Sequence, residues 1–374
     1  MKRILILSDP PAKPGYLPRL RYLCEFLARQ GYGIRLVTEE YEPLAFAHSY
    51  PIDTIRMYSG SKTDWLLKSV WTLISDWHNR AFARRVLKKM ESADERYDLV
   101  VCSTFNEFPL GAAQRIAKRL GVPLICDIRD LDEQVDDSRY QYHHQSPWLM
   151  PFRRIYRAIH IRRRNKVLRA ADAVTTVSPW HADFIRRFNA HVHVIYNGYD
   201  PAQFYPQDIR TEQFSVCYIG SLFEWQKKGL GVISNQFSVI SNQFSDVRLE
   251  VHTPQAEPVS HEELGDVIRR SGIMLVLSSR ETHGMLTTKF YEALGCSKPV
   301  LCVPSDEGAL AELIKYTQAG VATDDPEIIR AFIEQQYKKW QANGFTRQPA
   351  IHREEFSRET QCARMEEIIR HLLL

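Results

Sequence analysis

The chain has 374 residues, enough for two domains of ordinary size, and it is 44% hydrophobic and 25% charged with no excess of Gly or Pro. This composition is typical of a soluble globular protein and excludes collagenous and disordered classes. Because the first apolar run is short and no run of about 18 apolar residues occurs, we expect neither a signal peptide nor a membrane-spanning helix.

The net charge of +4 conceals an uneven distribution. Residues 1–190 carry 31 Lys and Arg against 21 Asp and Glu, which gives +10, whereas the remainder carries 18 against 24, which gives −6. We therefore expect only the first half to face an anionic partner or surface.

The seven cysteines are scattered and never form a Cys-x-x-Cys pair. Their odd number and irregular spacing argue against a disulfide framework and against a zinc site. Reduced thiols of this kind indicate a cytoplasmic protein.

In chain order, short apolar runs alternate with amphipathic segments. In the first half, a helix is predicted at 17–31, and strands are predicted at 3–7, 34–38, 98–102, 122–127, 173–177 and 192–196. The alternation of strand and helix predicts a parallel sheet covered on both faces.

The same alternation restarts in the second half, with strands predicted at 214–220, 247–252, 273–278 and 298–303. There VISNQFS occurs twice in succession, at 232–238 and 239–245, and its apolar residues form one core-facing helical stripe.

The predicted fold class is α/β, with two doubly wound, Rossmann-like domains facing a cleft. The predicted domains are 1–190 and 191–350, followed by a helix in 351–374 that packs back on the first domain.

The stretch ETHGMLTTKFYEALGCSKPV, residues 281–300, combines hydroxylated residues with charge. A helix beginning near Thr287 and Thr288 would offer free N–H groups and the positive end of its dipole to a phosphate. Lys289 adds a cation, and Glu292 on the same face can accept hydrogen bonds from two vicinal hydroxyls. Phosphate and diol together indicate a nucleotide, although the same residues also suit an ordinary capped helix.

A second stretch, YIGSLFEWQKKGL at 218–230, places Gly220 at the end of a predicted strand and Lys228 just before a predicted helix. The carboxyl end of a strand in an open α/β sheet is where phosphate ligands bind. Lys228 could reach a diphosphate, or it could simply be a solvated surface lysine.

These two stretches in this order resemble the donor half of GT-B-fold nucleotide-sugar glycosyltransferases. The resemblance is greatest to the retaining group that builds bacterial surface polysaccharides. VSPWHADFIRRF with VIYNGYDPAQFYP resembles the passage between the domains of that group, and DIRD at 127–130 resembles its acceptor-side strand end. The resemblance covers essentially the whole chain.

The resemblance implies a role for each donor-side residue. Lys228 would hold the donor diphosphate, Glu292 the ribose hydroxyls, and the backbone at Thr287 and Thr288 the phosphate with Lys289 nearby. Gly220 would end the donor-side strand, and Gly15 would belong to a glycine loop approaching the donor from the acceptor domain. The sequence departs from the family at Ser221, where an Arg is frequent, and at Gly284, where a Glu normally contacts the sugar.

The catalytic candidates lie in CDIRDLDEQ, after the strand predicted at 122–127. A base or charge-stabilising group should sit at the carboxyl end of a strand. Asp127 and Asp130 are the carboxylates there, with Arg129 between them, and Asp130 is favoured if Asp127 still belongs to the strand. The alternative is structural, with Asp127 capping a turn and Asp130 pairing with Arg129. Asn106 and Glu107 are further candidates for the acceptor side.

Two basic segments, 152–169 and 65–89, combine Arg and Lys with aromatic and aliphatic residues. Such a helix can lie on anionic lipid at the inner face of a membrane, or it can be a solvated basic face.

The favoured interpretation is a cytoplasmic glycosyltransferase that moves a hexose-type sugar from a UDP- or GDP-sugar to a saccharide or lipid-linked saccharide. Without an Asp-x-Asp motif at a strand end we expect no metal, and no cofactor, since the nucleotide-sugar is a substrate. Retention of anomeric configuration is implied by the resemblance alone.

A nucleotide-sugar 2-epimerase on the same fold is the first alternative, and the basic first half argues against it. A non-enzymatic membrane or nucleic-acid binding module is the second, but no nucleic-acid motif is present.

Overall fold

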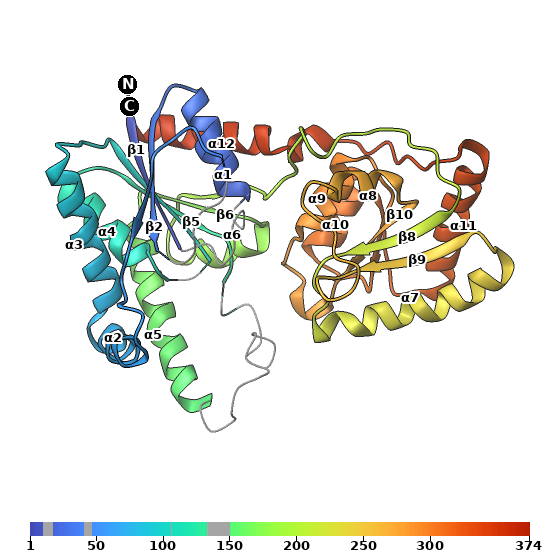
Figure 1. Cartoon of the computed structure of the whole chain (residues 1–374), viewed down its shortest axis with the longest axis horizontal. Coiled ribbons are helices and arrows are strands. Elements are labelled where there is room, and N and C mark those ends of the chain that lie inside the picture. Colours follow the sequence, from blue (N-terminus) through green and yellow to red (C-terminus); the bar gives the residue numbers. More distant parts are fainter. Residues whose placement is uncertain (10–17, 41–46, 106, 132, 134–149) are drawn as a thin grey trace. The chain divides into compact units, whose positions relative to one another are not determined.

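The computed structural model describes the chain except for residues 10–17, 41–46, 106, 132 and 134–149 and the side chains of 150–153. The chain divides into two compact units, residues 1–196 with 362–374, and residues 197–361 (Figure 1). Each unit is built around its own parallel sheet.

The sheet of the first unit has seven parallel strands in the order β3-β2-β1-β4-β5-β6-β7. The strands are β1 (Arg3–Ser8), β2 (Gly33–Glu39), β3 (Ile52–Ile55), β4 (Leu99–Thr104), β5 (Leu124–Ile128), β6 (Ala173–Thr176) and β7 (Val192–Val194). The strand order reverses direction between β1 and β4, as in a doubly wound sheet.

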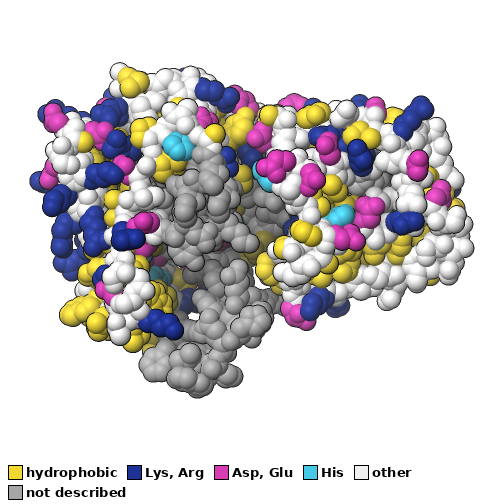
Figure 2. Space-filling model, in the orientation of Figure 1, with side chains coloured by type: hydrophobic (Ala, Val, Ile, Leu, Met, Phe, Trp, Pro, Cys, Tyr) yellow, Lys and Arg dark blue, Asp and Glu magenta, His cyan; other side chains and the backbone are white. Residues whose placement is uncertain are grey.

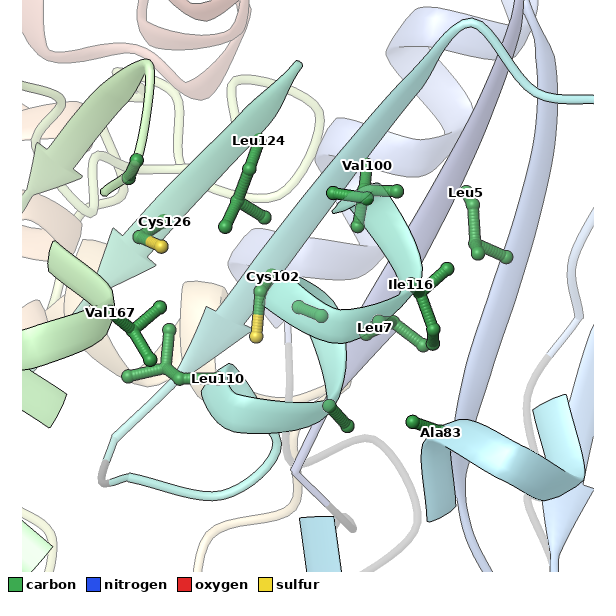
Figure 3. Close-up of a cluster of buried hydrophobic side chains, with 14 of the residues drawn as sticks. Leu5, Leu7, Ala83, Val100, Cys102, Leu110, Ile116, Leu124, Cys126 and Val167 are labelled. Carbon is green, nitrogen blue, oxygen red and sulfur yellow. The ribbon is translucent and has the colours of Figure 1, made fainter. Parts of the chain in front are cut away.

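Helices cover both faces of this sheet and bury its nearly continuous apolar strands (Figure 1). They are α1 (Pro18–Arg29), α3 (Trp77–Ser92), α4 (Leu110–Leu120), α5 (Met150–Arg169), α6 (Pro179–Ile185) and α12 (Arg358–Leu372), whereas α2 (Lys62–Ser75) packs on α3. On one face, Val100 and Leu124 of neighbouring strands pack with Ile116 of α4 (Figure 3). On the other face, Ile4 packs with α1 and with Met365 of α12.

The second unit has a five-stranded parallel sheet in the order β12-β11-β10-β8-β9. Its strands are β8 (Phe214–Ile219), β9 (Val247–His252), β10 (Ile273–Leu277), β11 (Val300–Val303) and β12 (Gly320–Ala322). Its helices are α7 (Glu224–Gln243), α8 (Leu264–Arg270), α9 (Thr288–Gly295), α10 (Ala309–Thr317) and α11 (Pro326–Asn343), with 3-10 turns at Arg280–Thr282 and Arg353–Phe356. Here the order reverses between β8 and β10.

The repeated VISNQFS lies within α7 and its C-terminal end. Ile233, Phe237 and Ile240 are buried against the sheet, and Phe244 packs half-buried beside them. The predicted core-facing stripe is therefore confirmed.

The structure also contains features that the sequence patterns did not predict. The short strands β3 and β12 were not expected, and the first unit runs to Tyr196.

All seven cysteines are buried thiols. Among the described residues, no helix is both long enough and apolar enough to cross a membrane.

Candidate functional site

Ligands of open parallel sheets bind beyond the carboxyl ends of the strands, where the strand order reverses. In the second unit this point lies between β8 and β10, and in the first unit between β1 and β4. Most of the predicted residues that the structure describes fall at or next to these two places, and we describe the two clusters separately.

In the second unit, α9 begins at Thr288 with Thr287 as its N-cap. The Thr287 backbone is extended, and its hydroxyl accepts a hydrogen bond from the N–H of Lys289 at 3.4 Å. The predicted start of this helix is confirmed. The N-terminus of α9 therefore presents backbone donors and the positive end of its dipole.

Gly220 and Lys289 lie against each other. A Cβ added at Gly220 would approach Cε of Lys289 to 2.7 Å and Nζ to 2.9 Å, and the φ of Gly220 is +128°. The positive φ favours glycine at this position, and the end of the Lys289 side chain would have to shift to admit a Cβ. The Nζ of Lys289 also lies 5.4 Å from the centre of the Tyr218 ring on β8, so the ammonium is held at the end of that strand.

Glu292 lies one turn along α9, on the side that carries Lys289. Burial raises the pKa of Glu292 above its ordinary value, while Lys289, Arg358 and the Thr288 hydroxyl act in the opposite direction. Burial correspondingly lowers the pKa of Lys289, and Glu292 opposes that shift. The cluster thus holds a carboxylate and two cations close together in a partly desolvated place.

Lys228 lies inside α7 and not before it, so the prediction of a helix starting after Lys228 was wrong. α7 begins at Glu224 because the Gln226 side chain accepts a hydrogen bond from the N–H of Phe223 at 2.9 Å and caps the helix. Lys227 pairs with Glu224 at 2.6 Å. Lys228 is exposed and has no ionic partner in the part of the chain that the structure describes.

In the first unit, Asp127 is buried within β5 and its carboxylate is fully engaged. Arg19 donates to Oδ2 at 2.6 Å, Ser103 donates to the same oxygen at 2.7 Å, and Thr175 donates to Oδ1 at 2.7 Å. Burial alone would raise the pKa of Asp127, but Arg19 and the two hydroxyls outweigh it and leave that pKa below its ordinary value. The three donors tie α1, β4 and β6 to β5.

Arg129 follows β5 and pairs with Asp9 at 2.6 Å, with its guanidinium 3.6 Å from the centre of the Phe105 ring. Asp9 directly follows β1, and burial raises its pKa against the opposing effect of Arg129. Asp130 is half-buried beside this pair. The structural alternative for Asp130 was a pair with Arg129, but Arg129 pairs with Asp9 in the structure.

The remaining acceptor-side predictions lie apart from this pair or outside the described residues. Glu107 is buried and hydrogen-bonded by Asn79 at 2.6 Å and His160 at 3.1 Å, which is a structural arrangement between helices. Gly15 and Asn106 lie outside the described residues.

One group of side chains could hold a metal ion. The ligand atoms of Cys217 on β8 and of Glu250 and His252 on β9 all lie within 4.8 Å of one another. Cys217 is buried, and the Nδ1 of His252 lies 3.2 Å from the carbonyl oxygen of Glu257, which leaves Nε2 facing Glu250. These residues were not predicted to act together.

Comparison with protein-family models gives one match, to the glycosyl transferase 4-like domain, over residues 15–198. This range contains β2 to β7 of the first sheet and the Asp127 cluster. No curated protein was found that matches the chain in sequence.

Solved structures match over nearly the whole chain. Sucrose-phosphate synthase from Thermosynechococcus elongatus is 17% identical with a TM-score of 0.64, covering 100% of this chain and 99% of that one. Anabaena HepE in complex with UDP-glucose is 13% identical with a TM-score of 0.62, covering 99% and 100%. A UDP-N-acetylglucosamine 2-epimerase homologue from Listeria monocytogenes is 11% identical with a TM-score of 0.59, covering 98% and 96%. The predicted GT-B fold is confirmed.

Several residues of the two clusters were not predicted from the sequence to belong to them. Asp9 has a recognisable signal, because it is an acidic residue placed directly after a buried strand. Arg19 lies 108 positions before Asp127, and Arg358 lies 66 positions after Glu292. Nothing in the local sequence connects these pairs, since only the folded chain brings them together.

Proposed function

We propose that this protein is a glycosyltransferase that moves a hexosyl group from a UDP- or GDP-sugar to a saccharide or lipid-linked saccharide. The observation that carries the proposal is the packing of Gly220 against Lys289, with Glu292 one turn along α9, where the order of the second sheet reverses. The glycosyl transferase 4-like domain and the fold shared with UDP-glucose-bound HepE support the same reading.

The donor would be held by complementary chemistry in the second unit. The N-terminus of α9 at Thr287 and Thr288 would receive the diphosphate, and Lys289 and the exposed Lys228 would supply positive charge. Glu292, as a carboxylate, would accept hydrogen bonds from the two ribose hydroxyls. As the sugar leaves, these groups would stabilise the charge that develops on the diphosphate, so no metal is required in this proposal.

On the acceptor side we propose different roles for the predicted catalytic residues. Asp130 is the candidate for a group that contacts the reacting centre. Asp127 is a positioning residue, because all its hydrogen bonds go to Arg19, Ser103 and Thr175. Arg129, fixed by Asp9 and the Phe105 ring, would contribute positive charge at the carboxyl end of the strands. We further propose a retaining reaction in the cytoplasm, at the inner face of a membrane.

A nucleotide-sugar 2-epimerase is the second candidate, favoured by the structural match to the Listeria monocytogenes protein. Such an enzyme would interconvert a UDP-sugar with no acceptor present. Formation of an epimeric UDP-sugar from UDP-N-acetylglucosamine would support it, whereas acceptor-dependent release of UDP supports transfer.

The test is calorimetric titration of the purified protein with UDP and with GDP. Hydrogen bonds to a charged group contribute about 1.5–3 kcal/mol, so Glu292→Ala should weaken binding of the preferred nucleotide by about tenfold to a hundredfold. The matched control is Glu312→Ala, which removes an exposed glutamate from the first turn of α10. If wild type binds neither nucleotide, or if both variants bind like wild type, the proposed donor site is wrong.

A further inference from the structure

An amphipathic surface helix normally turns its apolar side toward the core, but α2 does the reverse. Leu66, Val70 and Ile74 are spaced four residues apart on one side of the helix, and they are 59%, 48% and 70% exposed. Trp65, Leu67 and Trp71 are 57%, 62% and 56% exposed. Thr72 is the one residue of α2 that is buried. We call these six exposed side chains the α2 face.

The α2 face is held outward by polar contacts on the opposite side of the helix. Lys68 donates to the carbonyl of Met57 at 3.0 Å, and Arg163 of α5 donates to the carbonyls of Thr72 and Leu73 at 2.8 Å each. The two bonds from Arg163 satisfy carbonyls in the last turn of α2, and all three bonds fix the orientation of the helix. The outward direction of the α2 face is therefore built into the first unit.

Exposed apolar area of this extent on one helix marks an interaction surface. Figure 2 shows hydrophobic side chains gathered where α2 lies in Figure 1, beside Lys and Arg side chains over α3. α5 also has the exposed apolar side chains of Ile155 and Tyr156.

The charge around the α2 face indicates what would cover it. α2, α3 and α5 carry 2, 5 and 8 Lys and Arg residues, against 1, 1 and 0 Asp and Glu residues. The single acidic residue of α2, Asp64, is paired with Lys68 at 2.7 Å. Exposed cations include Lys62 of α2, Arg84 and Lys88 of α3, and Arg162 of α5.

We propose that the α2 face inserts into the interfacial region of an anionic lipid bilayer, with the basic side chains of α3 and α5 against the lipid head groups. Helices that lie in a membrane surface typically carry Leu and Trp on one side, next to Lys and Arg. Trp is well suited to the boundary between head groups and acyl chains. Anionic head groups attract the surrounding cations.

This inference deepens the proposed function, because a lipid-linked saccharide would be presented at the same bilayer. The two can fail separately. Vesicle binding by the α2 face requires no nucleotide, and UDP binding by the second unit requires no lipid.

The experiment is flotation of the full chain with phosphatidylcholine vesicles that contain or lack phosphatidylglycerol. Wild type should float with the phosphatidylglycerol vesicles and should bind less as salt is added, because the Lys and Arg contacts are screened. The double variant Leu66→Glu/Ile74→Glu should bind at least about tenfold more weakly, since two charges would enter the interface. Both positions are exposed, so the fold should survive, which circular dichroism checks.

The matched control is Val239→Glu/Ile328→Glu, which places the same two charges at exposed apolar positions of the second unit. It should float like wild type, and both double variants should keep wild-type titration with UDP. In vesicles with brominated acyl chains, Trp fluorescence should be quenched, and Trp65→Phe/Trp71→Phe should lose most of that quenching.

Three outcomes would overturn the proposal. The wild-type protein could float neither with the vesicles that contain phosphatidylglycerol nor with those that lack it. The variant Leu66→Glu/Ile74→Glu could float like wild type. Alternatively, sedimentation could show a wild-type dimer that this variant dissociates, in which case the α2 face is an interface between two copies of the chain.

Discussion

Asp127 of the first unit and Glu292 of the second differ in how their charge is compensated. Asp127 accepts three hydrogen bonds, one of them from Arg19, and its pKa lies below the ordinary value. Glu292 has Lys289 and Arg358 nearby, yet burial still raises its pKa. The first carboxylate is satisfied by the fold, whereas the second retains capacity to accept further hydrogen bonds.

The comparison separates a positioning group from a binding group. A carboxylate that already accepts three hydrogen bonds from the fold gains stability from them and has at most about one acceptor site left for a ligand. A partly desolvated carboxylate beside cations destabilises the free protein slightly and becomes better satisfied when donors arrive. Perturbed pKa values occur at both kinds of site, so only the count of hydrogen-bond partners distinguishes them.

The largest expected effect is on stability, from Asp127→Ala. Removing one partner of a buried ion pair leaves Arg19 and two hydroxyls without their acceptor, which should lower the free energy of unfolding by about 3–5 kcal/mol. Urea denaturation measures this. Asp183→Ala is the control, because Asp183 pairs with Arg186 on the surface and should change stability by less than about 1 kcal/mol. Equal losses in the two variants would refute the structural role assigned to Asp127.

A smaller effect is expected from Gly220→Ala in the second unit. A φ of +128° is strained for alanine, so we expect a loss of about 1–3 kcal/mol, and the new Cβ would displace the end of the Lys289 side chain, so we also expect weaker UDP binding. Gly231→Ala in α7 is the control, since its added Cβ would point into open space outside the backbone of its own helix. Alanine there should raise stability by up to about 1 kcal/mol. Thermal unfolding and UDP titration of both variants would show whether Gly220 is needed for the contact with Lys289.

Much of the fold follows from local patterns in the sequence. Apolar runs at 98–102 and 122–127 correctly predicted β4 and β5, and the Thr287–Thr288 pair correctly predicted the start of α9. β3 and β12 were missed because they are only four and three residues long and mostly half-buried, so they carry little apolar signal.

The sites were harder to predict, because their geometry depends on distant pairs. The partner of Asp127 is Arg19, and the partner of Arg129 is Asp9 rather than the adjacent Asp130. The start of α7 was placed too late because its cap comes from the Gln226 side chain, not from a typical N-cap residue. For α2, the apolar periodicity indicates a helix but gives no information on whether its stripe faces the core or the solvent.

The smallest expected effect is a difference in pH dependence between Glu292→Gln and Asp127→Asn. Because folding raises the pKa of Glu292, the folded state binds its proton more tightly, and the stability due to this group falls as pH rises above the ordinary glutamate value of 4.5. Glu292→Gln should therefore be more stable than wild type at neutral pH, by about 1 kcal/mol or less, and the gap should close as pH falls toward that value.

Asp127 should show the opposite sign. Folding lowers its pKa, so its contribution is present above the ordinary aspartate value of 3.8 and is lost as pH falls below it. Asp127→Asn should therefore be less stable than wild type at neutral pH and should approach wild type in acid. Urea denaturation of the three proteins across this pH range measures both differences. If both variants lost stability at neutral pH, Glu292 would be satisfied by the fold in the same way as Asp127, and its assignment as the ribose-binding residue would be wrong.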